Sequence, residues 1–538
     1  MTLRPGSALL GLLLALAAVW TPGTPAQADT LVRNRSEGWS AADERGYGEF
    51  VAALGASGCR TVDACLKSPA NPFRASDDTG LRWRADCADL PYFLRFYYAW
   101  KRGLPFAHVS AVSPRGRARD IRYSPRGNQV AARRDVLSGD NALAVMRRLR
   151  DTISSATYRI HPRLEGNDLY SPALTPRAIR PGTVIYDPNG HLAVVWRIEN
   201  DGRIRYIDAH PDNSLTRGTY DLRFARASPG MGAGFKNWRP VRLVGASRGQ
   251  GGTLEGGRIV TARNGEIGDF ALTQFFGTDA PPPDDAAWKR GGFVLNGTRL
   301  DYYDYVRAAL GGGSLHFDPL HEVAEMTVSN CADLGYRAEA VALSLAAGIQ
   351  NRPQPERLPE NIYGTEGDWE TYSTPSRDAR LKTAFKELRD SAQRFLELWR
   401  ARDPRLGYAG RDLAGDMLAV HDRAAAQCRV TYARSDGAVV TLDYEEARRR
   451  LFRLSFDPYH CVERRWGAEG PEAASCRDGA LKRRWYEAEQ GLRNQIDRTY
   501  ESRMDFSLGQ LEARLLGTGP AAPPDTDLRG FLLKEKGR

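Results

Sequence analysis

The chain has 538 residues, too many for one hydrophobic core, so we expect two or three domains. Its composition, with 42% hydrophobic and 26% charged residues, is typical of a globular protein and excludes a wholly disordered one. The formal net charge of +10 would suit an anionic partner. Because the sequence contains no zinc-finger spacing, RNA-binding signature or heptad region, we predict no nucleic-acid partner.

Residues 1–28 have the pattern of a secretory signal peptide. Arg4 precedes an apolar run over residues 8–20, and the small-x-small site Ala26-Gln27-Ala28 predicts a mature chain that begins at Asp29. The apolar run is short for a membrane span, and no later segment reaches that length. We therefore predict a periplasmic or extracellular protein that is soluble after cleavage, without stable membrane insertion. An uncleaved anchor is the alternative.

Seven cysteines leave at least one unpaired, and the others are expected to form disulfides in an oxidising compartment. The short spacing of Cys59 and Cys65, and of Cys461 and Cys476, suits two local disulfide loops. Cys331 and Cys428 can then pair with each other, which leaves Cys87 free. Other pairings satisfy the sequence equally, because sequence alone does not fix connectivity.

The first half of the mature chain alternates helical and strand patterns. Residues 39–54 read as a helix capped by Ser40, and residues 88–101 read as a helix that Gly103 ends. Asp86 stands at an N-cap position, which would put Cys87 in the first turn. Strands joined by tight turns are expected at Thr183–Tyr186, Leu192–Ile198 and Ile204–Ile207, as an antiparallel meander.

Between these helices and strands lies an arginine-rich stretch, Arg115 to Arg134. Its basic residues are Arg115, Arg117, Arg119, Arg122, Arg126, Arg133 and Arg134. Such a run is a candidate surface for an anionic polymer, for example a cell-wall glycan. A solvated loop is the alternative.

The second half divides into three segments. Glycines near residue 250 and prolines at 281–283 predict a linker and connecting segment over residues 246–312. Residues 313–516 are expected to form a mostly helical domain, and the Pro/Ala-rich residues 517–538 a loose C-terminal tail. Helices are expected at Cys331–Ala347, Arg380–Arg402, Tyr444–Leu454 and Ala480–Met504. The polar and aromatic residues 369–377 are predicted to line a binding surface.

Three residues of the first half suit nucleophilic chemistry. A helix start stabilises a thiolate at Cys87, and its backbone N–H can help to hold an oxyanion. His191 opens a predicted strand, and Asp208 ends the next one, where it can accept a hydrogen bond from the imidazole. His210, two residues further on, is the alternative third member.

These motifs resemble two related families. Asp86-Cys87 with Leu90, followed by Gly103-Leu104-Pro105, resembles the cysteine helix of NlpC/P60 peptidases. Pro181-Gly182-Thr183, leading to Gly190-His191-x-Ala193-Val194, is similar to that family's two strands, with Thr183 in place of the usual Asp. The transglutaminase-like group of the papain-like fold fits better the spacing from His191 to Asp208. The resemblance covers about residues 80–215, and the long step from Cys87 to His191 requires an insertion around residues 112–175 relative to a compact NlpC/P60 domain.

The resemblance implies an α+β architecture with a papain-like domain over residues 29–245 and a mostly α-helical C-terminal domain. It implies cysteine-dependent hydrolysis or transfer at an amide or isopeptide bond, with Cys87 as nucleophile, His191 as base and then acid, and Asp208 as orienting group. A peptidoglycan stem peptide is the substrate class that the resemblance and export together suggest. No metal or organic cofactor is implied. The alternative is an inactive envelope binding or scaffold protein, because fold does not guarantee function. The oligomeric state is not predicted.

Two other groups of residues are rival sites. Cys331-Ala332-Asp333-Leu334 repeats the letters of Cys87-Ala88-Asp89-Leu90, also at an expected helix start, but no strand-borne histidine follows it. We expect Cys331 to be a disulfide half. The polar group His316, Asp318, His321, Glu322 and Glu325 lacks the His-Glu-x-x-His spacing of a metal site, so we expect solvated side chains there.

Overall fold

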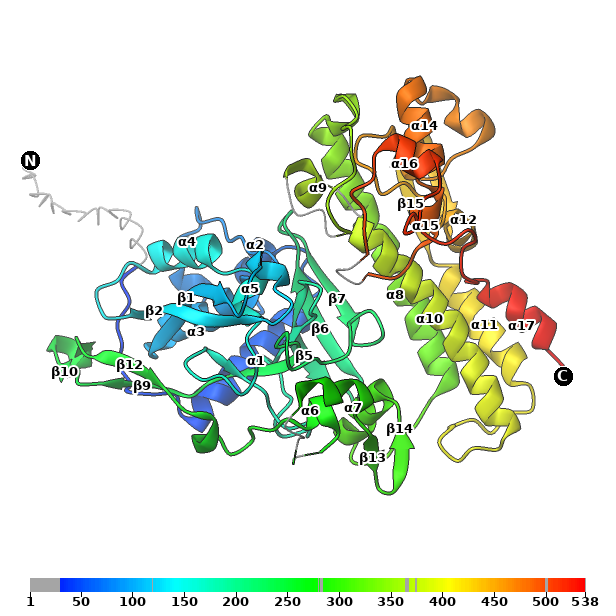
Figure 1. Cartoon of the computed structure of the whole chain (residues 1–538). Helices are drawn as coiled ribbons and strands as arrows, with labels where there is room; N and C mark the ends of the chain where they lie inside the picture. Colours follow the sequence, from blue (N-terminus) through cyan, green and yellow to red (C-terminus); the bar gives the residue numbers. More distant parts are fainter. Residues whose placement is uncertain are drawn as a thin grey trace, which may run out of the picture.

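The computed structural model describes residues 30–118, 120–278, 280, 284–362, 367–372, 375–498 and 502–537 (Figure 1). The expected signal peptide, Asp29 and Arg119 lie outside the described residues. Within these ranges, no helix is both long and apolar enough to cross a membrane. The N-terminal part mixes helices with antiparallel strands, and the C-terminal part is mostly helical.

A six-stranded antiparallel sheet is the centre of the N-terminal part. Its order is β3-β8-β4-β5-β6-β7, with β3 (Leu169–Tyr170), β8 (Gly234–Trp238), β4 (Val184–Tyr186), β5 (Leu192–Ile198), β6 (Ile204–Ala209) and β7 (Leu215–Thr219). The three predicted strands are β4, β5 and β6, so the expected meander is confirmed. The β4–β5 turn ends at Gly190, whose φ of 98° favours glycine.

Helices cover both faces of this sheet, because alternate side chains of each strand point to opposite sides. Val184 and Val194 pack with α1 (Ala41–Ala56) and α3 (Leu90–Arg102). Ile185 and Val195 pack on the other face with α6 (Thr273–Phe276) and α7 (Tyr302–Leu310). The sheet is therefore a buried and rigid support for residues at its strand ends.

The first two long helices begin and end close to the predicted residues. Ser40 caps α1 in a reciprocal capping box with Asp43, and Gly103 ends α3 in the left-handed conformation. Between α3 and the sheet, the expected insertion is a hairpin of β1 (Phe106–Pro114) and β2 (Asn128–Val136), followed by α4 (Ala142–Thr152) and α5 (Ser155–Tyr158). The short α2 (Val62–Lys67) precedes α3.

The arginine-rich stretch spans the β1–β2 hairpin and contains both bonded and exposed residues. Arg133 pairs with Asp168 at 2.7 Å, and Arg122 pairs with Asp120 and Glu370. The described arginines left exposed on this hairpin are Arg115, Arg117, Arg126 and Arg134.

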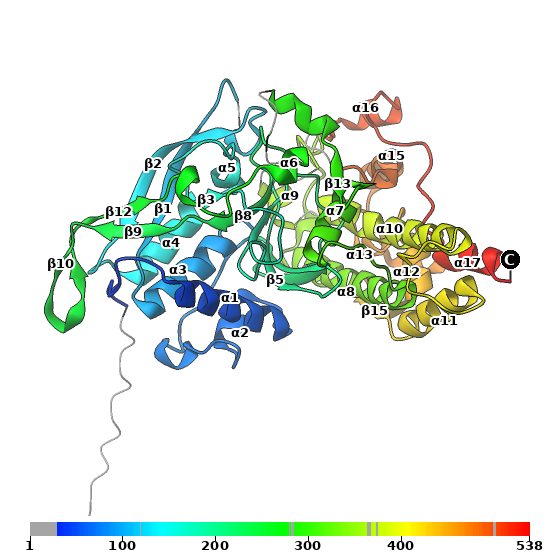
Figure 2. The ribbon, with the colours of Figure 1, turned by 90° about the horizontal axis from the view of Figure 1, so that it is seen from below.

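The expected linker over residues 246–312 is wrong, because this segment is folded: its first part forms strands of an arm, and its later part packs on the sheet. It contains β10 (Ser247–Arg248), β11 (Leu254–Glu255), β12 (Arg258–Thr261), β13 (Phe293–Leu295) and β14 (Thr298–Leu300), besides α6 and α7. Phe275 and Phe293 are buried in the sheet's second core. The glycines form turns: Gly257, at φ 79°, follows β11 where β12 turns back to pair with β9 (Val241–Val244). Figure 2 shows β9, β10 and β12 as an arm that extends from the sheet.

Long helices form the C-terminal part. They are α8 (Pro319–Ala346), α10 (Pro375–Arg400), α11 (Leu413–Ala425) and α17 (Leu528–Glu535), with shorter helices α9 (Gly367–Tyr372), α12 (Tyr444–Arg450), α13 (Val462–Arg465), α14 (Ala480–Ala488), α15 (Gln490–Asn494) and α16 (Leu508–Glu512). One hairpin, β15 (Arg429–Ala433) with β16 (Val439–Asp443), interrupts them.

Three expectations for this part are wrong. The helix expected over Ala480–Met504 is two short helices, α14 and α15, and the described residues after Asn494 in that range are not helical. The helix expected to start at Cys331 begins at Pro319, where Asp318 caps it, so Cys331 lies in mid-helix. The expected loose tail contains α17, whose Leu528 and Leu532 are buried against α10 and α11. Local residues mark the starts of both α8 and α17: Asp318 caps α8, with Pro319 in its first turn, and Asp527 caps α17.

The disulfides have the proposed partition. Cys59 bonds Cys65, Cys331 bonds Cys428, and Cys461 bonds Cys476. Among the described residues Cys87 is the one free cysteine, and it is partly buried. Three disulfides are compatible with an exported protein.

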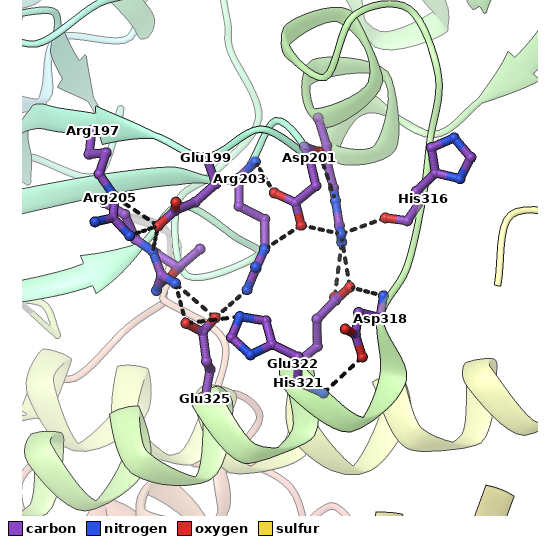
Figure 3. Close-up of polar contacts among 12 residues, drawn as sticks. Arg197, Glu199, Asp201, Arg203, Arg205, His316, Asp318, His321, Glu322 and Glu325 are labelled. Atoms are coloured by element: carbon purple, nitrogen blue, oxygen red, sulfur yellow. Dashed lines mark hydrogen bonds and ion pairs between the residues drawn. The ribbon is translucent and has the colours of Figure 1, made fainter. Parts of the chain in front are cut away.

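An ion network joins the sheet to α8 (Figure 3). Glu325 binds Arg203 and Arg205, while Glu322 binds Arg307, which also reaches Asp201 at 2.9 Å. The acids of the rival polar group on α8 are thus occupied by arginines, and the arrangement holds the helical part against the β5–β6 turn.

Candidate functional site

Cys87 lies in a tight turn directly before α3, not inside the first turn of the helix. The turn is closed by a reciprocal pair: Asp86 Oδ1 accepts from the backbone N–H groups of Ala88 (2.8 Å) and Asp89 (3.1 Å), and Asp89 Oδ1 accepts from Asp86 N–H (2.7 Å). Tyr158 donates its hydroxyl to Ala88 O at 2.5 Å. Asp86 therefore closes the turn before the helix, but the predicted N-cap at Asp86 is wrong, because the N-cap of α3 is Asp89 and Cys87 precedes it.

His191 and Asp208 are brought together by the pairing of β5 with β6. His191 directly precedes β5, and Asp208 is the penultimate residue of β6. Their closest atoms, Nε2 and Oδ2, are 2.7 Å apart. Asp208 also accepts from the hydroxyl of Thr216 on β7. The side chain of Asp208 is 1% exposed, so its carboxylate depends on these partners.

Charges around Asp208 keep it ionised. Burial opposes its charge, but the imidazoles of His210 and His191 and the guanidinium of Arg380 together hold the pKa of Asp208 well below its usual range. Burial and Arg380 lower the pKa of His191, against the hydrogen bond to Asp208. His191 is therefore a neutral imidazole at pH 7 in this conformation.

His210, the alternative third member, stacks on His191 with ring centroids 6.0 Å apart. Its Nε2 lies 3.0 Å from Thr216 Oγ1 and 3.8 Å from Asp208 Oδ2. His210 therefore contacts Thr216, a hydrogen-bond partner of Asp208, whereas Asp208 itself makes the direct hydrogen bond to His191.

A cavity of about 190 Å³ brings the thiol and the imidazole to one wall. Its lining includes Cys87, Tyr123, Ser155, His191, His210, Glu370, Ser376, Arg377 and Arg380. The backbone N–H of Leu192, the residue after His191, lowers the pKa of the Cys87 thiol, which puts the two near each other. Cys87 and His191 thus line one cavity, and Asp208 binds the imidazole.

The expected thiolate is not the resting form. Burial raises the pKa of the Cys87 thiol, and the neighbouring carboxylates of Asp86, Asp208 and Asp89 raise it further, while the Leu192 hydrogen bond lowers it less. Sequence reasoning considered the helix end and the histidine but not these acids. The thiol is protonated at neutral pH.

Arg380, which sequence reasoning missed, reaches the site from α10. Its Nη1 lies 2.9 Å from His191 Nε2 and 3.6 Å from Asp208 Oδ2. Two tautomers of His191 compete as a result. With the proton on Nε2, the ring donates to Asp208 and Nδ1 is a free base; with the proton on Nδ1, Nε2 accepts from Arg380 instead. The sequence feature that pointed to this part of the site was the predicted binding segment 369–377, since Glu370, Ser376 and Arg377 line the cavity.

Cys331 is not a rival nucleophile in this structure, because it is bonded to Cys428. The neighbouring histidine on α11, His421, is fully buried and contacts Thr327 and Glu445.

No family model, no curated protein and no solved structure matches the chain. The site's chemistry is therefore argued from its own geometry.

Proposed function

We propose that the chain is an exported cysteine-dependent hydrolase or acyltransferase with a papain-like arrangement, acting on amide or isopeptide bonds of cell-wall stem peptides. One observation carries the proposal: the free thiol of Cys87 shares a cavity with His191, whose Nε2 is 2.7 Å from the buried carboxylate of Asp208. A thiol, an imidazole and an orienting acid are the parts that acyl transfer needs.

The packing around the site supports a papain-like arrangement. Helix α3, which follows the cysteine turn, packs on one face of the antiparallel sheet whose neighbouring strands carry His191 and Asp208. A nucleophile before a helix and a base on the packed sheet are held by two rigid elements.

In the proposed reaction, the Cys87 thiol gives its proton to His191 Nδ1 while its sulfur attacks the carbonyl carbon. The C–N bond breaks, the imidazolium returns the proton to the leaving amine, and the acyl group stays on sulfur as a thioester. Water or a second amine then takes the acyl group, with His191 removing a proton from that nucleophile and giving it to the sulfur. Proton transfer to His191 during the attack suits a thiol whose pKa is raised, because no free thiolate is then needed.

The oxyanion has a candidate donor in the backbone N–H of Cys87. No hydrogen bond from this N–H joins it to another described residue. Arg377 and Arg380 put positive charge on the cavity wall, which suits a peptide that carries carboxylates. The exposed arginines of the β1–β2 hairpin would suit the anionic glycan that bears such peptides.

The second candidate function is an inactive binding or scaffold protein. Two observations favour it: carboxylates raise the pKa of Cys87, and Arg380 contacts the nitrogen that should donate to Asp208. The enzyme proposal accommodates both only if His191 holds its proton on Nε2.

The test is turnover of purified peptidoglycan fragments and synthetic stem peptides, followed by mass spectrometry of the products. We expect Cys87→Ser and His191→Gln to abolish turnover, and Asp208→Asn to reduce kcat by at least about 100-fold. His210→Asn is the matched control and should keep most activity. Turnover by Cys87→Ser equal to that of the natural chain would overturn the nucleophile assignment. No turnover of any peptide by the natural chain would support the scaffold function.

A further inference from the structure

Three buried side chains of the helical part converge on one point. Asp457 and His460 belong to the loop between α12 and α13, and Glu489 is the residue between α14 and α15. All three are 0% exposed. Asp457 Oδ2 lies 3.8 Å and Glu489 Oε2 lies 3.7 Å from His460 Nε2.

These separations are close to those of ligands around one small cation. Ligand atoms at about 2.0–2.2 Å from a tetrahedral zinc ion are roughly 3.4 Å apart. The observed distances exceed this by a few tenths of an ångström, and the three ligand atoms lie within 4.8 Å of one another. Small side-chain rotations would bring the group to coordination distance.

Several of the converging atoms have no hydrogen-bond partner. His460 Nε2 and both carboxylate oxygens of Glu489 are buried and unbonded within the described residues. The nearest guanidinium, that of Arg493, stops 3.8 Å from Glu489 Oε2 and donates to Tyr486 O and Gln490 Oε1 instead. Buried carboxylate oxygens without a hydrogen bond, whose ion pairs to His460 and Arg493 are 3.7 Å or longer, remain costly, and a central cation would contact all of them at once.

A carboxylate beside His460 Nδ1 suits the tautomer that a metal requires. His460 Nδ1 lies 3.1 Å from Asp478 Oδ2, and Asp478 Oδ1 accepts from the backbone N–H of Cys461 at 3.0 Å. A carboxylate behind the histidine directs the Nε2 lone pair toward the shared point. Gln354 donates to Asp457 Oδ2 at 2.6 Å, which fixes that carboxylate too.

We propose that Asp457, His460 and Glu489 bind one divalent transition-metal ion, with zinc as the expected occupant. One imidazole nitrogen with carboxylate oxygens suits zinc better than magnesium or calcium, which prefer oxygen ligands alone. Zinc also binds such a set more tightly than manganese. With both Glu489 oxygens free, bidentate binding completes four ligand atoms.

The position assigns the ion a structural role. It joins the loop that follows α12 to the α14–α15 junction, beside the Cys461–Cys476 disulfide. Asp478, which contacts His460 Nδ1, lines a cavity of about 590 Å³, whereas the three proposed ligands do not line it. The sequence offers no recognisable spacing, because Glu489 is far along the chain from Asp457 and His460.

The test uses the exported chain purified without a polyhistidine tag. After chelator treatment and desalting, zinc chloride or manganese chloride is added, and bound metal is measured by mass spectrometry and calorimetry. We expect one equivalent of zinc, a higher melting temperature with zinc, and weaker binding of manganese.

Glu489→Gln keeps the shape of the side chain and should weaken zinc binding by at least about 100-fold, while Asp478→Asn should weaken it about 10-fold to 100-fold. His421→Gln is the matched control: it also alters a fully buried histidine, outside the cluster, and should bind zinc normally. Circular dichroism checks that each variant folds.

Zinc binding by Glu489→Gln and His460→Gln equal to that of the natural chain would overturn the proposal. The proposal would also be overturned if the natural chain bound no more zinc than the double variant that carries both substitutions.

Discussion

Arg380 offers the sharpest test of how the helical part affects the candidate site. Replacing Arg380 with Met removes a guanidinium 2.9 Å from His191 Nε2 and keeps an apolar side chain over the Phe224 ring. Two unit charges about 4 Å apart interact by about 4 kcal/mol at an effective dielectric constant of about 20. Since water will fill part of the space, we take half of this value, which corresponds to a rise in the pKa of His191 of about 1.5 units.

The assay is NMR of the protein with carbon-13-labelled histidine, assigned with His191→Gln, in parallel with the rate of Cys87 alkylation. A more basic imidazole holds a thiolate better, so alkylation at pH 7 should rise about tenfold. Arg377→Met is the control, because Arg377 lies on the same helix and cavity wall but pairs with Asp212 at 3.4 Å. An unchanged His191 titration in Arg380→Met, or an equal shift in Arg377→Met, would refute the reasoning.

Three further predictions concern stability. Burial and Arg377 lower the pKa of His210 to about 3 in the folded protein, whereas an unfolded histidine titrates near 6.5. The neutral form of His210 therefore stabilises the fold above pH 6.5. This contribution to the free energy of unfolding is lost as the pH falls toward 3. Urea unfolding should show the natural chain losing about 2 kcal/mol more than His210→Asn between pH 7 and pH 5; parallel pH profiles would contradict this. Changing Cys331 and Cys428 to Ser opens a bridge across 97 residues and should cost about 4–5 kcal/mol, and an unchanged melting temperature would count against it. Gly202→Ala places a Cβ against the carbonyl oxygen of Arg307 at a φ of 85°, and should cost about 1–3 kcal/mol in thermal unfolding; a neutral effect would show that this turn is free to move.

Local signals in the sequence predicted much of the N-terminal part. Ser40 with Asp43 marks a helix start, and Gly103 a helix end, through hydrogen bonds and backbone preferences that depend on neighbouring residues alone. Short apolar segments separated by turn residues marked the three central strands. Short spacing suggested two of the cysteine bridges and the remaining residues the third, while the sequence left other pairings open.

Features that depend on long-range packing were not predictable in this way. The glycines and prolines of residues 246–312 indicate turns, but not that Phe275 and Phe293 between them enter the core. The packing of α8 on α10 and α11 is recorded by no local pattern, although Asp318-Pro319 marks the start of α8. Arg380 reaches His191 only because α10 lies across the strand ends, and no pattern near either residue records that contact.

The prediction of a stabilised thiolate at Cys87 was wrong for a related reason. A helix start favours a thiolate, but the capping residues that build this start, Asp86 and Asp89, are acids beside the sulfur. The same side chains that position the nucleophile oppose its ionisation. The proposed enzyme therefore needs the proton transfer to His191 during attack.

The most direct test of the central claim is a covalent acyl group on Cys87. The natural chain is mixed with an activated ester of a stem peptide, quenched in acid within seconds, and examined by intact mass and peptide mapping. The account predicts one added acyl mass on Cys87, its slow loss on return to neutral pH, and no adduct in Cys87→Ser or His191→Gln. Acylation at lysines alone, at equal rates in all three proteins, would contradict it.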